Sequence, residues 1–123
     1  MCTLVLAWQV FADAPVVVAA NRDELLDRPS EPPAVRDWEP PAVAPLDAEA
    51  VRVALQPEPG EGGEAWLDRA ATVIADHEYG VCVHRDGFGT RSSSLLRLGD
   101  ERVYEFADGP PCRTPYERVD NSI

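Results

Sequence analysis

Residues capable of chemistry stand at the outer ends of the first two apolar segments of the chain. The first is Cys2, and the second group is Asn-Arg-Asp-Glu at 21–24, which follows five apolar residues within "PVVVAANRDELLDRP" (15–29). A strand that simply reached the surface would end in a turn signal such as Asn-Gly or Pro-Asp. An amide, a guanidinium and two carboxylates in succession therefore predict a site at this point.

Cys2 would combine a nucleophile and a base in one residue if the initiator methionine is removed. A small residue in this position normally permits that removal, so we expect the mature chain to begin with Cys2. Its α-amino group would have a pKa near about 8, much closer to neutrality than that of a lysine. This is the N-terminal variant of nucleophilic catalysis. The simpler alternative is an ordinary small residue after Met.

A hairpin would bring these two groups together. Residues 2–10 and 16–20 are expected to form its strands, because both are apolar and a proline-containing loop separates them. Asp23 or Glu24 would then hold or orient the amine, and Arg22 would lower the thiol pKa or bind a substrate carboxylate. For Arg22 and Glu24 the simpler alternative is an exposed ion pair worth about 0–1 kcal/mol.

The remaining pattern predicts a single α+β domain with an antiparallel sheet. The further elements expected from periodicity and turn signals are helices at 47–56 and 64–76 and strands at 80–85, 88–98 and 102–107. A proline-rich stretch at 28–45 is expected to be an extended loop, and the tail from 108 to be irregular. Neither of the first two strands alternates cleanly, which favours a sheet covered on both faces or a position in the centre of the sheet.

Composition limits the partners and the compartment. The chain has 22 acidic and 11 basic residues, all of the latter arginine, and a net charge of -11. Such a chain repels nucleic acid and anionic membranes, and no apolar run approaches the roughly 20 residues that span a bilayer. The complete absence of lysine is typical of proteins from salt-loving archaea. The start lacks the basic region of a signal peptide, so a cytoplasmic location is expected.

The three cysteines, at positions 2, 82 and 112, have an odd count and no C-x-x-C spacing. This pattern argues against a disulfide framework and against a zinc knuckle, and no metal or cofactor is predicted. Cys82 and His84 could form a dyad on one strand face, but a buried thiol beside a hydrogen-bonded imidazole is the favoured interpretation.

Arg91 is followed by three serines. It could bind a carboxylate or phosphate, or it could simply lie on a solvated strand edge.

The segments "MCTLVLAW", "AANRDE" and "DRP" resemble the NRDE-motif family, the relatives of the transport and Golgi organisation 2 protein. "GFGTRSSSLL" (87–96) is similar to a late strand of that family. The resemblance implies an N-terminal-nucleophile (Ntn) hydrolase-like fold, in which two antiparallel sheets stack between helices and Cys2 is the nucleophile. In the bile salt and penicillin V acylases, which share this architecture, an Asp of an Arg-Asn-x-Asp motif contacts the nucleophile. Asp23 takes that role by position, whereas Ala20 replaces the leading Arg and no role transfers to Arg22.

The middle of the chain departs from this resemblance. Family members are longer and carry a Gly-Gly-Thr-Trp element and a long middle section that we do not find here. We therefore expect an internal deletion near Ala50 and Val51, which would join a hairpin and loop (1–50) to a late helix and strands (51–123). By analogy with the acylases it would remove asparagines of the oxyanion hole, each worth about 10²–10³ in rate. It would also expose sheet edges that favour association.

Three functions stay open at this point. The first is a cysteine Ntn amidohydrolase that cleaves a non-peptide C–N bond, with Cys2 and Asp23 as catalytic residues. Asn21, Arg22, Glu24 and Arg91 would bind substrate or support the site. The second is a carrier without turnover, because relatives have been linked to the handling of haem and acyl-CoA. The third is a shortened family fragment that folds partially and has no activity.

Overall fold

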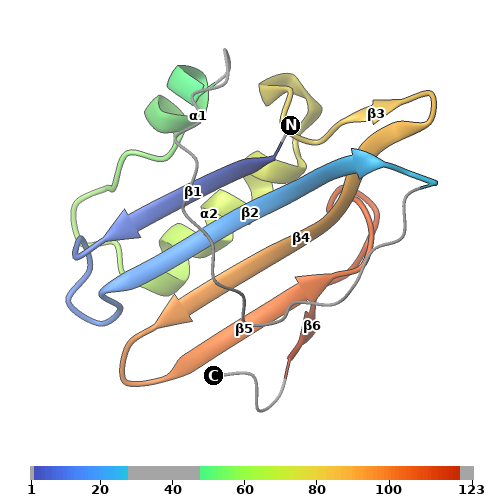
Figure 1. Ribbon diagram of the computed structural model, residues 1–123. Coiled ribbons are helices and arrows are strands. Elements are labelled where there is room, and N and C mark those ends of the chain that lie inside the picture. Colours follow the sequence, from blue (N-terminus) through green and yellow to red (C-terminus); the bar gives the residue numbers. More distant parts are fainter. Residues whose placement is uncertain (1, 28–47, 120–123) are drawn as a thin grey trace.

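The computed structural model of the protein describes residues 2–27 and 48–119, so the proline-rich stretch at 28–45 lies outside the described residues. The described chain forms a six-stranded sheet with α-helices on one side (Figure 1). Its elements are β1 (Thr3–Trp8), β2 (Val16–Leu25), α1 (Ala48–Ala54), α2 (Gly63–Ala75), the 3-10 helix η1 (His77–Tyr79), β3 (His84–Arg85), β4 (Phe88–Leu98), β5 (Arg102–Ala107) and β6 (Glu117–Arg118). None of the described helices has the length and apolar character needed to cross a membrane.

All pairs of neighbouring strands are antiparallel, in the order β1-β2-β4-β5-β6, and β3 pairs with the first residues of β4. The predicted first hairpin is confirmed, with Thr3 opposite Asn21 at one end and Trp8 opposite Val16 at the other. The predicted α+β architecture is also confirmed. The described residues make one sheet, and the second stacked sheet that the family resemblance implies is not found among them.

β2 is longer than the sequence predicted. We expected the strand to stop near Ala20, but it continues to Leu25 because the polar residues that follow stay paired with β4. Side chains of β2 alternate between buried and half-buried, and the buried set includes both Asn21 and Asp23. The Asn-Arg-Asp-Glu motif therefore lies inside a central strand, where alternate side chains face opposite sides of the sheet.

The helix predicted at 64–76 is confirmed as α2, and it covers one face of the sheet. Its apolar positions recur at the helical period, so they form a single stripe that can be buried against the strands. The buried residues of the stripe are Trp66, Leu67, Ala70, Val73 and Ile74, and they join Val17, Ala19 and Leu95 of the sheet in one hydrophobic cluster.

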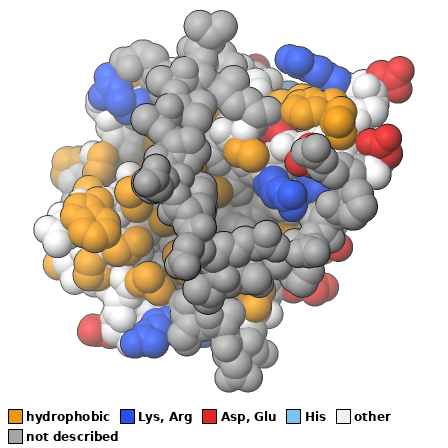
Figure 2. Space-filling model, viewed as in Figure 1, with side chains coloured by type: hydrophobic (Ala, Val, Ile, Leu, Met, Phe, Trp, Pro, Cys, Tyr) orange, Lys and Arg blue, Asp and Glu red, His pale blue; other side chains and the backbone are white. Residues whose placement is uncertain are grey.

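On the opposite face of the sheet, no helix or strand of the described residues covers β1. We expected the first two strands to be covered on both sides or to lie in the centre of the sheet, and for β1 both expectations are wrong. It is an edge strand, and the side chains of Leu4, Leu6 and Trp8 are 64%, 50% and 63% exposed. Figure 2, seen from this side, shows hydrophobic side chains gathered on the β1 side of the face. The sequence of β1 alone could not indicate this, because elements from elsewhere in the chain decide which face of a sheet is covered.

The start of α2 is capped from a distance. Gly62 at its N-cap has no side chain to offer, and the carboxylate of Asp13 accepts hydrogen bonds from Gly63 N at 3.1 and 3.3 Å instead. A negative charge at this end of a helix is favourable. Gly63 also permits a close approach, because a Cβ there would lie 2.7 Å from the Cβ of Ala14. The β1–β2 loop is therefore docked onto α2.

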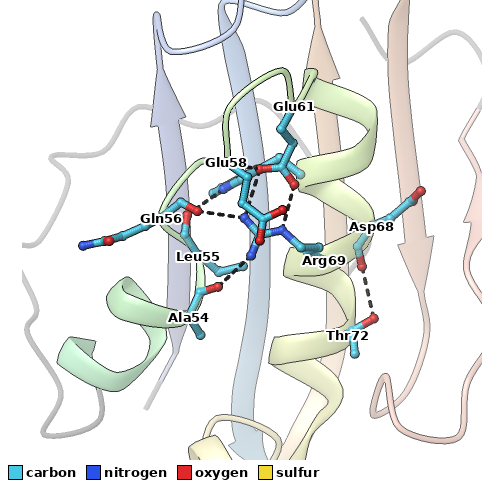
Figure 3. Close-up of polar contacts among 9 residues, drawn as sticks. Ala54, Leu55, Gln56, Glu58, Glu61, Asp68, Arg69 and Thr72 are labelled. Atoms are coloured by element: carbon cyan, nitrogen blue, oxygen red, sulfur yellow. Dashed lines mark hydrogen bonds and ion pairs between the residues drawn. The ribbon is translucent and has the colours of Figure 1, made fainter.

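Arg69 of α2 holds the end of α1 and the loop that follows it (Figure 3). Its guanidinium pairs with the Glu61 carboxylate through Nε–Oε2 and Nη2–Oε1 distances of 2.7 and 3.0 Å. It also donates to the carbonyl oxygens of Ala54 and Gln56, at 2.8 and 2.9 Å. Since Ala54 is the last residue of α1, this satisfies a carbonyl that the helix leaves without an internal partner.

The second half of the chain follows the predicted meander with two differences. The strand expected from Gly80 begins only at His84, because the chain first forms η1 and then an irregular segment at 81–83. The tail, expected to be irregular, contains the short strand β6, which pairs with Glu105 and Phe106 of β5.

Candidate functional site

The first hairpin places Cys2 beside Asp23. The Cys2 side chain is exposed, and its Sγ lies 3.8 Å from the main-chain carbonyl oxygen of Asp23. This follows from the register, since Thr3 is opposite Asn21 and the preceding residue therefore reaches the next part of β2. The contact runs through the main chain of Asp23, while its side chain belongs to the buried set of β2 that faces α2.

The Asp23 carboxylate is held on the helix side of the sheet by Thr90 of β4. Thr90 Oγ1 donates to Asp23 Oδ1 at 2.6 Å and accepts a hydrogen bond from Val83 N at 2.8 Å. Burial raises the pKa of the Asp23 carboxyl above its ordinary value, and the hydrogen bond from Thr90 opposes that rise. Asp23 is thus linked through one hydroxyl to the segment that precedes β3.

Asn21 supports the end of α2. Its side chain is 1% exposed, and Nδ2 donates to the carbonyl oxygens of Ile74 and Val81 at 2.8 and 2.9 Å. Ile74 lies in the last turn of α2, where helix carbonyls need external donors. Asn21 Oδ1 is buried and has no hydrogen-bond partner within residues 2–27 and 48–119. The amide of the motif therefore joins the helix end to the following segment.

The two other charged residues of the motif lie on the open side of β2. Arg22 Nη2 and Glu24 Oε2 are 4.0 Å apart, and Arg22 is 42% exposed. A surface pair of this kind contributes little to stability.

Arg91 of β4 lies where the pairing register of β2 and β4 shifts, since Arg22 pairs with Ser92 and Asp23 with Thr90. Its Nε is buried and lacks a hydrogen-bond partner in the described part of the chain.

A hollow of about 340 Å³ opens beside Cys2 on the open side of the sheet. Its lining combines the thiol, a cation, hydroxyl groups and an apolar wall. The residues that supply these groups are Cys2, Arg22, Ser92, Ser94, Tyr104 and Phe106. Such a surface can take a small molecule that carries a carboxylate or carbonyl group on an apolar body.

A larger hollow of about 580 Å³ lies at the other end of β2, between the β1–β2 and β4–β5 loops. The described residues that line it include the charged Asp13, Asp100 and Arg102 and no cysteine or histidine. We therefore place the candidate site at the smaller hollow, where a nucleophile is present.

Cys82 and His84 lie close together, with Sγ and Nε2 3.7 Å apart. Burial raises the pKa of the Cys82 thiol, which makes it a weaker nucleophile at neutral pH. His84 Nε2 is also 3.2 Å from the Sγ of Cys112, a contact that spans 28 positions and that sequence spacing did not indicate. The cluster that these side chains form with His77 was missed for the same reason.

A comparison with protein families decides the identity of the N-terminal part. The model of the family described as Transport and Golgi organisation 2 matches residues 1–68, more than half of the 123 residues. The chain belongs to the Transport and Golgi organisation 2 family. The match includes β1, β2 with the Asn-Arg-Asp-Glu motif, and α1, and it confirms the family resemblance of the sequence. No curated protein and no solved structure matches the chain.

Proposed function

We propose that the protein is an Ntn-type amidohydrolase in which Cys2, freed from Met1, is the nucleophile. The observation that carries this proposal is the exposed Cys2 thiol at the hollow of about 340 Å³ that Arg22 also lines. A nucleophile, a cation for an anionic substrate group and an apolar wall meet there. Family membership adds support, because the matched residues include both Cys2 and the motif beside it.

The reaction would proceed through an acyl-enzyme. The α-amino group of Cys2 takes the thiol proton, and Sγ attacks the carbonyl carbon of the amide. The C–N bond then breaks and the amine leaves with that proton. Water hydrolyses the thioester, which releases the carboxylic acid and restores the thiol.

The remaining residues of the site would bind and position. Arg22 would pair with a carboxylate of the substrate, and the hydroxyls of Ser92 and Ser94 would hydrogen-bond its polar groups. Asp23 would be a positioning residue, because its main chain contacts the thiol while its carboxylate is anchored to Thr90. Glu24 would moderate the charge of Arg22, from which it is 4.0 Å away.

The test is acyl-enzyme trapping on the full chain, with a panel of N-acyl amides and activated acyl esters followed by intact mass spectrometry. We expect a chain without Met1 and a single acyl adduct that maps to Cys2. Cys2→Ala should abolish adduct and turnover, whereas Cys112→Ser, which removes another exposed thiol, should still form the adduct at Cys2. A chain that retains Met1, or turnover that survives in Cys2→Ala, would contradict the proposal.

A carrier function is the second candidate, and the open apolar edge of β1 favours it. The exposed Leu4, Leu6 and Trp8 provide an apolar surface on the strand that begins next to Arg22. Haem and acyl-CoA both join an apolar body to anionic groups. Binding would show as a Soret shift for haem or as quenched tryptophan fluorescence for acyl-CoA, and Arg22→Ala should weaken it. If neither ligand binds at micromolar concentration, the carrier function is wrong.

A further inference from the structure

Four side chains able to bind a metal converge at the end of α2, and none of them is among the described residues that line the hollow beside Cys2. They are His77, Cys82, His84 and Cys112, and their ligand atoms all lie within 4.8 Å of one another. They come from three separate segments: η1, the residues around the start of β3, and the turn that follows β5. All four lie beyond residues 1–68, so the family match does not account for them.

The distances fit a tetrahedral site. His84 Nε2 is 3.7 Å from Cys82 Sγ and 3.2 Å from Cys112 Sγ, and the rings of His77 and His84 meet edge to face with centroids 5.0 Å apart. Around a tetrahedral zinc ion, neighbouring sulfur and nitrogen ligands lie about 3.3–3.8 Å apart. Even the widest separation in the cluster would therefore need to contract by at most about 1.5 Å.

The donor set selects the kind of metal. Two thiolates and two imidazoles are soft or borderline ligands, and no carboxylate belongs to the cluster within the described residues. Hard cations such as Mg²⁺ and Ca²⁺ prefer oxygen ligands, while tetrahedral S₂N₂ sets are typical of zinc. With four protein ligands there is no open coordination position for a substrate, which is the arrangement of a structural site.

The segment that carries the buried ligand is held in place from both sides. Next to Cys82, the Val81 carbonyl accepts from Asn21 Nδ2, and Val83 N donates to Thr90 Oγ1. Thr90 N in turn donates to the Val83 carbonyl at 2.8 Å. Cys82 is 4% exposed, whereas the other three ligands are exposed. The cluster thus has one rigid buried ligand and an outer side open to solvent, by which an ion can enter.

We propose that His77, Cys82, His84 and Cys112 form a structural zinc site that ties the turn after β5 to the end of α2. Zinc would replace direct contacts between the thiols and imidazoles with four coordinate bonds, and it would join residues 28 positions apart. A small domain with a limited core gains much from such a cross-link. The net charge of -11 also favours the approach of a divalent cation.

The test uses the reduced full chain, stripped with a chelator and then titrated with Zn²⁺ and with Co²⁺ as a spectroscopic probe. We expect one ion per chain by elemental analysis, a rise in Tm with added zinc, and release of protons on binding. With Co²⁺, tetrahedral d–d bands should appear together with thiolate-to-cobalt charge transfer. None of these measurements involves Cys2, so the proposal stands or falls independently of the proposed hydrolase.

Variants of the exposed ligands make the test specific. Cys112→Ser and His84→Gln should each weaken zinc binding by on the order of 100-fold or more, because even the loss of a residue that hydrogen-bonds a metal ligand costs about 10–100-fold in affinity. Competition with a chromophoric chelator would measure the affinity. Both positions are exposed, and far-UV circular dichroism would confirm that the variants fold. Cys2→Ser is the matched control, because it removes an exposed thiol outside the cluster and should bind zinc like the wild type.

Three results would overturn the proposal. The first is wild-type protein that retains no zinc after gel filtration. The second is zinc affinity that is the same in Cys112→Ser as in the wild type. The third is a Cys82–Cys112 disulfide that forms in a glutathione buffer at the reduction potential of the cytosol. The two thiols would then lie close together because they form a covalent cross-link and not because they bind zinc.

Discussion

Replacing Asn21 with alanine should destabilise the end of α2 more than any other part of the fold. The change removes the donor that satisfies the carbonyls of Ile74 and Val81, at 2.8 and 2.9 Å, in a place where the side chain is 1% exposed. A buried polar group left without a partner costs about 1–3 kcal/mol. Two such groups predict a loss of about 2–6 kcal/mol in the free energy of unfolding.

That loss is large for a domain of this size, whose total stability is expected to be about 5–15 kcal/mol. Urea unfolding of the chelator-treated protein, followed by circular dichroism and tryptophan fluorescence, would measure it. Hydrogen exchange would locate it, since amides of residues 76–83 should lose protection first. A broad, shallow wild-type transition would instead support the partially folded fragment that the sequence left open.

Two further variants sharpen this experiment. Asn21→Asp keeps the volume but presents a carboxylate to two carbonyl oxygens, so it should cost at least as much as Asn21→Ala. Ser94→Ala is the matched control, because Ser94 pairs with Ala20 one position away and makes a 3.3 Å contact with the Tyr104 hydroxyl. It should cost no more than about 1 kcal/mol. A loss below about 1 kcal/mol for Asn21→Ala, or exchange that rises evenly over the sheet, would refute the reasoning.

Three other predictions concern the charged residues. Asp13→Ala removes the distant cap of α2 and should cost about 0.5–2 kcal/mol in urea unfolding, and no loss would show that Gly62 caps well enough alone. Because burial raises the pKa of Asp23 above its ordinary 3.8, the folded state binds the proton more tightly, so this group's contribution to stability is lost as pH rises through the window above 3.8. In Asp23→Asn the free energy of unfolding should lack this dependence on pH between about pH 3 and 7. Parallel curves of unfolding free energy against pH for the two proteins would contradict this prediction. The hydrogen bond from Arg69 lowers the pKa of Glu61 below 4.5, so Arg69→Met should remove stability that is present above pH 4.5 and fades below it, as acid unfolding midpoints would show.

Much of the fold follows from local patterns in the chain. The apolar segments at 2–10 and 16–20, with a short proline-containing loop between them, predict the first hairpin, and the helical period around Trp66 and Ile74 predicts α2. These predictions held because each depends on residues that are neighbours in sequence. The N-terminal motif indicated the family for the same reason, since its letters are contiguous.

The faces of the sheet could not be derived in this way. Asn21 and Asp23 look like the polar end of a strand, but they are tolerated within β2 because their partners come from residues 53 to 67 positions away. No local pattern indicates such partners. The sequence also could not show that β1 is an edge strand, whose outward apolar side chains stay exposed.

The cluster of two cysteines and two histidines shows the same limit most clearly. Zinc sites are recognised in sequence by closely spaced pairs of ligands, and here Cys112 stands 28 positions after His84. It meets the other ligands because the meander returns the chain to the end of α2, whose following segment Asn21 and Thr90 hold in place. Motifs and periodicity report short-range order along the chain, whereas a site of this kind exists only after distant segments have packed.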